Sequence, residues 1–117
     1  MVEDRITDGK RIAQLLASEL TGLDAGPLAD VAVVDADSDA KPSESGTFAY
    51  RIVVGDAELA ELWLFPSAVE LAFSVAPVRG ADERGLLTAD RTARIESGAA
   101  VKSAVDLLRA TAETRLE

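Results

Sequence analysis

Four arginines form the main concentration of positive charge in this sequence. Arg79, Arg84, Arg91 and Arg94 fall within 16 residues, and two glycines lie among them. A guanidinium group can bind a phosphate or carboxylate through two parallel hydrogen bonds, and backbone amides at glycines can help to hold an anion. The segment 78–94 is therefore a candidate anion- or ligand-binding site. An alternative stays open, in which the arginines pair locally with acidic neighbours and brace a long connection; these neighbours are Asp82, Glu83 and Asp90.

The acidic run DADSD has the alternation of a calcium-binding loop, with carboxylates at Asp35, Asp37 and Asp39. An EF-hand loop also needs glycine at its sixth position and glutamate at its twelfth. These two positions hold Ala40 and Gly46, so the motif fails twice. We expect no specific metal site and no cofactor, and a surface that attracts hydrated cations without selectivity.

Catalytic chemistry has few candidates in this chain. It contains no His and no Cys, which removes thiolate nucleophiles and the side chain most used for proton transfer near neutral pH. No phosphate-binding loop, GxSxG or HExxH motif is present. We assign no catalytic residue, lean against an enzyme, and interpret the facing of Arg51 and Glu61 on neighbouring strands as a structural pair.

The charge inventory is strongly acidic, with 21 Asp and Glu against 12 Lys and Arg and a net charge of -9. Only three of the basic residues are lysines (Lys10, Lys41 and Lys102), and Ala and Val are abundant. This composition resembles that of small acidic α+β proteins from extremely halophilic archaea, and the resemblance implies a salt-rich cytoplasm but no activity. An ordinary acidic protein is the alternative. Negative charge also disfavours binding to nucleic acid.

The N-terminal segment is charged and lacks the apolar stretch of a signal peptide, and no apolar run is long enough to span a membrane. We therefore expect a cytoplasmic protein with no membrane partner. The length of 117 residues fits a single domain, 1–117.

Two amphipathic helices are predicted at the ends of the chain. In residues 6–22 an apolar face recurs at helical spacing, with Thr7 or Asp8 as the cap and Gly22 as the stop. In residues 97–116, Ser97 is the candidate cap. The apolar face of this second helix consists of Val101, Val105, Leu108 and Ala112.

Four strands are predicted between the helices, at 28–36, 47–54, 57–65 and 68–75. The fold class is therefore α+β, with two layers: a four-stranded antiparallel meander sheet and both helices packed on one face, in the order α-β-β-β-β-α. The segment 78–94 is predicted to be a connection.

Strand alternation assigns the faces of this sheet. The apolar face of the fourth strand consists of Val69, Leu71, Phe73 and Val75. A two-residue turn at Pro66-Ser67 places Leu64 and Leu62 opposite Val69 and Leu71. The second strand then needs a three-residue turn, Gly55-Asp56-Ala57, or an equivalent bulge, to bring Phe48 and Tyr50 to the core face.

In this register an apolar patch lies on the sheet face without helices. It consists of Ala49, Leu59, Trp63, Phe65 and Ala72. Exposed apolar patches on acidic proteins mark interfaces, so the leading hypothesis is a non-catalytic interaction module, a homodimer through this face or a complex with another protein. The alternative to an interface is that Trp63 is a core residue, or that another segment of the chain folds over it.

Overall fold

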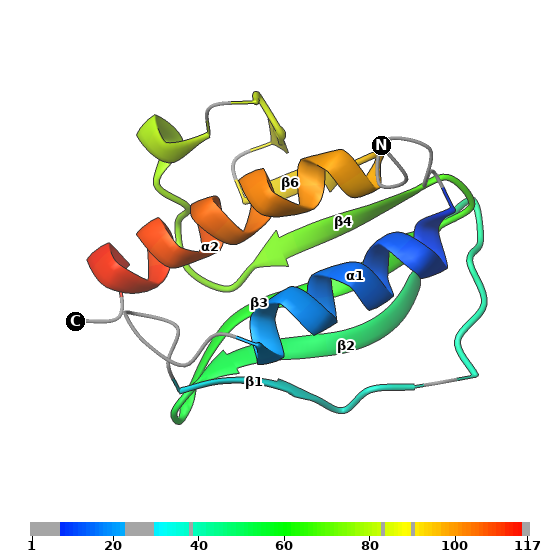
Figure 1. Ribbon diagram of the computed structural model, residues 1–117, viewed down its shortest axis with the longest axis horizontal. Helices are drawn as coiled ribbons and strands as arrows, with labels where there is room; N and C mark the ends of the chain where they lie inside the picture. The colour runs from blue at the N-terminus through cyan, green and yellow to red at the C-terminus, as the bar shows by residue number, and fades with distance from the viewer. Residues whose placement is uncertain (1–7, 23–29, 38, 83, 90, 116–117) are drawn as a thin grey trace.

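The computed structural model describes residues 8–22, 30–37, 39–82, 84–89 and 91–115 (Figure 1). In chain order, its helices and strands are α1 (Gly9–Thr21), β1 (Val31–Val34), β2 (Thr47–Val54), β3 (Ala57–Phe65), β4 (Ala68–Phe73), the 3-10 helix η3 (Arg79–Ala81), β5 (Leu87–Ala89), β6 (Thr92–Ile95), the 3-10 helix η4 (Gly98–Ala100) and α2 (Val101–Arg115).

The strands form one antiparallel sheet in the order β1-β2-β3-β4-β6-β5. Both α-helices lie on the same face of it (Figure 1). The predicted α+β class and the placement of the helices are confirmed. The predicted number of four strands is wrong, because the sheet has six.

The two additional strands, β5 and β6, lie in the segment that we predicted to be a connection. They are only three and four residues long, too short for an alternating pattern to stand out from charged surroundings. Strand β6 is instead specified by its partner, because Val69 to Ala72 of β4 pair with Ile95 to Thr92. Strand β6 is therefore specified by long-range pairing with β4, and its own short sequence gives no clear strand pattern.

Helix α1 begins where the Asp8 side chain caps a backbone amide of the first turn. The Asp8 carboxylate accepts a hydrogen bond from the backbone N–H of Lys10 at 2.9 Å, and the helix ends at Gly22, both as predicted. Thr7, the other predicted cap, lies outside the described residues. Ile12, Leu16 and Leu20 are fully buried against the sheet, which fixes the helix by its apolar face.

Helix α2 begins later than predicted. Ser97 precedes the short helix η4 and makes no side-chain capping bond, and α2 itself starts at Val101. Its predicted apolar face is confirmed as buried: Val101, Val105, Leu108 and Ala112. The first strand is also shorter than predicted, at Val31–Val34.

The register between β3 and β4 is the predicted one, with Leu62 opposite Leu71 and Leu64 opposite Val69. The hairpin from β2 to β3 differs, because Val54 pairs with Ala57 across a two-residue turn. The odd residue is supplied instead by a bulge at Leu59, between the pairs Ile52–Ala60 and Val53–Glu58. The bulge that we allowed as an alternative to a longer turn is thus present.

A second bulge, at Ala49, was not predicted. Tyr50 faces Leu62, yet Phe48 faces Trp63, so that Ala49 has no partner on β3. Because one extra residue inverts the alternation that follows, Phe48 lies on the opposite face from Tyr50. The expectation that Phe48 belongs to the core face is therefore wrong.

Candidate functional site

The sheet face away from the helices, here called the outer face, carries an aromatic group. Phe48 of β2 lies beside Trp63 of β3, with ring centroids 5.8 Å apart and an interplanar angle of 76°. This edge-to-face geometry is the favourable one for aromatic rings. All three aromatic side chains of this face, Phe48, Trp63 and Phe65, are half-buried, so part of each ring remains in contact with water.

Phe65 is held from two sides. The guanidinium carbon of Arg94 lies 5.3 Å from the centroid of the ring, a cation–π distance. On another side the chain passes at Gly46, where a side-chain carbon would lie 2.8 Å from the ring and where φ is +91°. The glycine at this position thus satisfies both the backbone conformation and the close packing on Phe65.

Two arginine clusters flank the aromatic group. Arg51 contacts three carboxylates, at 2.6 Å from Glu58, 3.1 Å from Asp35 and 3.8 Å from Glu61, and its guanidinium carbon lies 6.0 Å from the Phe48 centroid. The predicted facing of Arg51 and Glu61 is confirmed by the strand register. Three carboxylates around one guanidinium leave this cluster with a negative charge.

The second cluster surrounds Arg94 on β6. Its guanidinium lies 2.9 Å from Glu70 on β4 and 3.2 Å from Glu96. Hydrogen bonds to Glu96 and to Glu70 raise the pKa of Arg94 above its ordinary value. Across the outer face from β2 to β6, four residues lie opposite one another in turn: Phe48, Trp63, Glu70 and Arg94. The first two form an aromatic pair and the last two form an ion pair.

The predicted interface residues are only partly brought together. Trp63, Phe65 and Ala72 are half-buried on the outer face. Leu59 is fully buried and Ala49 is 5% exposed, so their expected exposure on this face is wrong. Both are the extra residues of bulges, where alternation no longer assigns a face. Phe48, which was not among the predicted interface residues, lies opposite Trp63 on this face.

The four arginines of segment 78–94 do not converge on one point. Arg79 lies on η3, Arg91 donates a hydrogen bond to the backbone oxygen of Ser74 at 3.2 Å, and Arg94 is paired as described. Arg84 and Arg94 do line a common hollow of about 280 Å³, together with Glu96 and Ser97. Glu83 and Asp90 lie outside the described residues.

Asp82, one of the expected partners of these arginines, has a clear structural role. Its carboxylate accepts hydrogen bonds from the backbone N–H groups of Leu86 at 2.6 Å and Leu87 at 2.9 Å. These bonds close the turn that leads into β5, which includes Gly85 at a φ of +71°. A carboxylate used in this way organises the loop locally.

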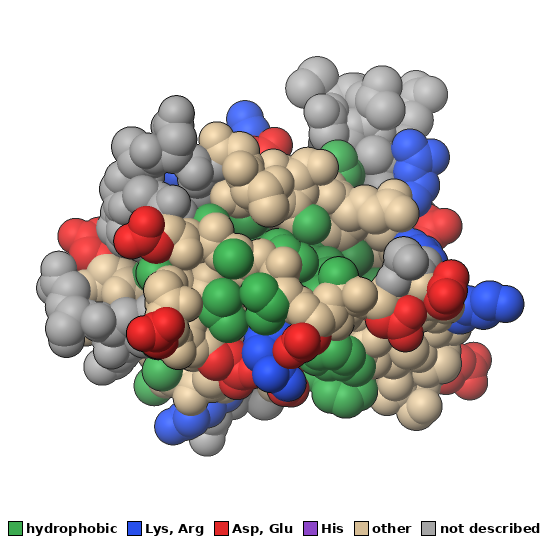
Figure 2. Space-filling model, turned by 90° about the horizontal axis from the view of Figure 1, so that it is seen from below, with side chains coloured by type: hydrophobic (Ala, Val, Ile, Leu, Met, Phe, Trp, Pro, Cys, Tyr) green, Lys and Arg blue, Asp and Glu red, His purple; other side chains and the backbone are tan. Residues whose placement is uncertain are grey.

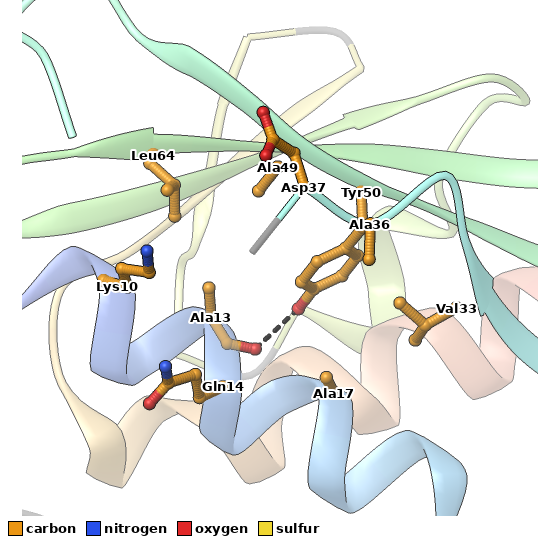
Figure 3. Close-up of a pocket in the computed structure, with 10 residues that line it drawn as sticks. All are labelled: Lys10, Ala13, Gln14, Ala17, Val33, Ala36, Asp37, Ala49, Tyr50 and Leu64. Carbon is orange, nitrogen blue, oxygen red and sulfur yellow. Dashed lines mark hydrogen bonds between the residues drawn. The ribbon is translucent and has the colours of Figure 1, made fainter. Parts of the chain in front are cut away.

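A cavity of about 230 Å³ lies between α1 and the start of β2 (Figure 3). The Tyr50 hydroxyl donates a hydrogen bond to the backbone oxygen of Ala13 at 2.7 Å, and burial raises the pKa of this phenol above its ordinary value. The Lys10 ammonium donates to the backbone oxygen of Ala40 at 2.9 Å. The sequence carries no signal of this cavity, because its lining residues come from separate segments of the chain and form no motif.

The surface around these features mixes apolar and charged groups. Figure 2, seen from the side on which β1 lies in Figure 1, shows hydrophobic side chains gathered near the middle with acidic and basic groups around them. Within the described ranges, no three or more acidic side chains gather in a way that could hold a metal ion. None of the helices described is long and apolar enough to cross a membrane.

These observations define the class: a two-layer α+β fold with helices on one face of a six-stranded sheet and aromatic side chains on the other. The chain belongs to a family of unknown function (DUF7993), whose model matches residues 1–116. Comparison with curated proteins and with solved structures gives no match.

Proposed function

We propose that this protein is a non-catalytic interaction module that forms a homodimer through the outer face. One observation carries the proposal: by the strand register, three of the five aromatic residues of the chain lie on the sheet face opposite the helices. Aromatic side chains are enriched at the centres of protein interfaces, where they bury much area at little entropic cost.

The arrangement of charge around the aromatic group supports this use. Interfaces combine an apolar centre with a polar rim that stays hydrated. Phe48 and Trp63 would form the centre, while the clusters of Arg51 and Arg94 lie to either side. Each arginine already has carboxylate partners within its own chain, so association leaves no guanidinium without a counter-charge.

A homodimer of this chain must overcome its own charge, since each copy carries -9. Exposed charges repel over roughly 10 Å at 0.1 M salt and over roughly 3 Å at 1 M. We therefore propose that the dimer works in a salt-rich cytoplasm, as the composition implies. The acidic surface would hold hydrated cations there without a specific site.

A second candidate is an anion- or ligand-binding protein that uses the segment 78–94. The hollow lined by Arg84, Arg94 and Ser97 favours it, because two guanidinium groups and a hydroxyl could meet one anion. Glu96 lines the same hollow and already pairs with Arg94, which opposes anion entry. We therefore favour the interaction module that forms a homodimer over the anion-binding protein.

The test is the solution mass by light scattering in molar KCl. Wild type should have twice the mass of one chain, and Trp63→Glu should halve it while keeping the wild-type circular dichroism. Ser18→Glu adds the same charge on the exposed side of α1 and should leave the mass unchanged. A folded Trp63→Glu protein with wild-type mass, or a monomeric wild type, would refute the proposal.

If Trp63→Glu unfolds, the ring contributes to the core more than its half-buried state indicates. Ala72→Glu is then the second variant to test. Ala72 lies on the same face, opposite Glu61, and its replacement removes no aromatic ring. Loss of the dimer in this variant supports the outer face, and retention of the dimer in it contradicts that face.

A further inference from the structure

We propose that the cavity between α1 and the start of β2 binds a small neutral molecule, about one aromatic ring in size, that carries a single hydrogen-bond donor. Here it is called the α1–β2 cavity, and its lining residues are labelled in Figure 3. This site is separate from the outer face, because Tyr50 and Leu64 belong to the opposite side of the sheet from Trp63.

The segment after β1 forms one side of the cavity, with Ala36 and Asp37 among its lining residues. Strand β1 pairs with residues 51–54 of β2 and ends at Val34. Asp35 then takes a left-handed conformation, with a φ of 55°, and turns the chain away. The next backbone contact between the two segments is the hydrogen bond from the N–H of Asp37 to the oxygen of Ala49 at 2.9 Å. Only Asp35 and Ala36 lie between these two contacts with β2, and Ala36 lines the cavity.

Small side chains keep this space open. Alanines at four positions, contributed by α1, by the segment after β1 and by β2, line the cavity: Ala13, Ala17, Ala36 and Ala49. Ala49 is the extra residue of a bulge, a feature that re-aims side chains and is frequent next to functional sites. One larger side chain at any of these positions would reduce the volume.

Two hydrogen bonds fix α1 against the segments around the cavity. The Tyr50 hydroxyl donates to the backbone oxygen of Ala13, and both residues line the cavity. The ammonium of Lys10, also a lining residue, donates to the backbone oxygen of Ala40, so the cavity is formed before any ligand arrives. Binding to a preformed cavity avoids the entropic cost of ordering the protein.

Volume and chemistry define the ligand. An apolar cavity of about 150 Å³ accommodates benzene, so about 230 Å³ has room for one ring with a substituent. The Tyr50 hydroxyl uses its proton on Ala13 and keeps acceptor capacity on its oxygen, so it can receive a hydrogen bond from the ligand. Lys10 and Asp37, of opposite charge, both line the cavity, which favours a neutral molecule.

The opening lies where exposed residues line the cavity. Gln14, Ala36 and Asp37 are exposed, whereas Ala13, Ala49 and Tyr50 are buried. A ligand would enter between α1 and the segment after β1, with its donor pointing inward toward Tyr50. In Figure 3 the Tyr50 hydroxyl points toward α1, among the lining residues.

The experiment uses phenol as the probe, with benzene and benzoate for comparison, added to the full chain in molar KCl. Binding is followed by amide chemical shifts in nuclear magnetic resonance spectra. Phenol should shift the signals of Ala13, Ala17, Ala49 and Tyr50 in a saturable way. It should bind more tightly than benzene, which has no donor, and than benzoate, which is charged. Equal binding of benzene, or tighter binding of benzoate, would overturn the ligand class.

Variants separate this site from a general affinity for apolar molecules. Ala17→Leu fills the cavity and Ala36→Leu narrows its opening, so each should weaken phenol binding by at least about tenfold. Ala110→Leu, at a half-buried alanine on α2, is the matched control and should bind as wild type does. Since Ala36 is exposed, its variant remains a test even if Ala17→Leu unfolds. Unchanged affinity in Ala36→Leu, or shifts confined to other parts of the chain, would overturn the site.

Tyr50→Phe removes the acceptor for the ligand and also the hydrogen bond to Ala13. A change in the shape of the cavity should weaken both probes alike, so the loss for phenol should exceed the loss for benzene by about fivefold, the equivalent of one ordinary hydrogen bond. An equal loss for both probes would show that the variant has altered the shape of the cavity and would overturn the assigned role of the hydroxyl.

Discussion

Replacing Gly9 by alanine offers a test in which sequence and structure predict opposite signs. Gly9 is the first residue of α1, and alanine is favoured over glycine in helices by up to about 1 kcal/mol. From the sequence alone, Gly9→Ala should therefore stabilise the protein. The structure predicts the reverse, because α1 begins directly against the turn between β3 and β4.

The magnitude follows from the distances at this contact. A side-chain carbon on Gly9 would lie 2.0 Å from the backbone oxygen of Phe65 and 2.5 Å from that of Ala68. Such contacts do not fall below 3.0 Å in real structures, so the helix and the turn must separate by about 1 Å. Overpacking of this kind costs about 1–3 kcal/mol.

The same separation breaks the hydrogen bond from the N–H of Gly9 to the oxygen of Pro66, now 3.3 Å long. Its loss costs about 1 kcal/mol, which offsets the gain in helix propensity. The free energy of unfolding should fall by about 1–3 kcal/mol, and the thermal midpoint by roughly 5–15 °C.

The assay is urea denaturation in molar KCl, followed by far-ultraviolet circular dichroism. Gly80→Ala is the matched control, because no atom lies within 4 Å of the added carbon, and it should change stability by less than about 0.5 kcal/mol. A Gly9→Ala protein as stable as wild type, or more stable, would refute the close packing of α1 on the β3–β4 turn.

Three further predictions concern charge. The thermal midpoint should rise steeply from low to molar KCl, since salt screens the net charge of -9; equal midpoints would contradict the halophilic interpretation. If the segment 78–94 binds anions, sulfate should stabilise more than chloride at matched ionic strength, and Arg84→Ala should abolish the difference, because Arg84 lines the hollow. A preference for sulfate that is unchanged in this variant would leave only general salt exclusion. Because burial raises the pKa of Tyr50 above 10.0 in the folded state, stability should fall as pH rises above about 10, measured by urea denaturation. This component should disappear in Tyr50→Phe, and an identical pH profile in the mutant would contradict it.

The sequence predicts the parts of the fold that local patterns encode. The apolar faces of both helices, the Asp8 cap and the β3–β4 register all follow from helical or alternating spacing. Strands β5 and β6 escape prediction because they are three and four residues long and are specified by pairing with β4.

The outer face shows where alternation stops being informative. Trp63 and Phe65 follow from the β3–β4 pairing, which has no irregularity. Phe48 could not be placed, because an unbulged strand would bring it to the same face as Tyr50. Ala49 carries no sequence signal of a bulge, such as glycine, and only the pairing of Tyr50 with Leu62 and Phe48 with Trp63 reveals it.

The α1–β2 cavity has no counterpart in the sequence at all. Its four alanines lie in three separate segments, and within each segment nothing in the sequence indicates that the alanine lines a cavity. Likewise the proximity of Arg84 and Arg94 around one hollow depends on the β6 pairing, which the linear arrangement of four arginines does not contain.

The two bulges have a consequence for chain length among related sequences. Each is one residue that the partner strand does not match, so its removal leaves the flanking pairs in place. A relative that lacks the residue at position 49 would still bring Phe48 opposite Trp63 and Tyr50 opposite Leu62, while losing one wall of the α1–β2 cavity. We therefore expect one-residue deletions in this family to fall at positions 49 and 59. Relatives with a deletion at position 49 should keep the pair of Phe48 and Trp63 but not the α1–β2 cavity.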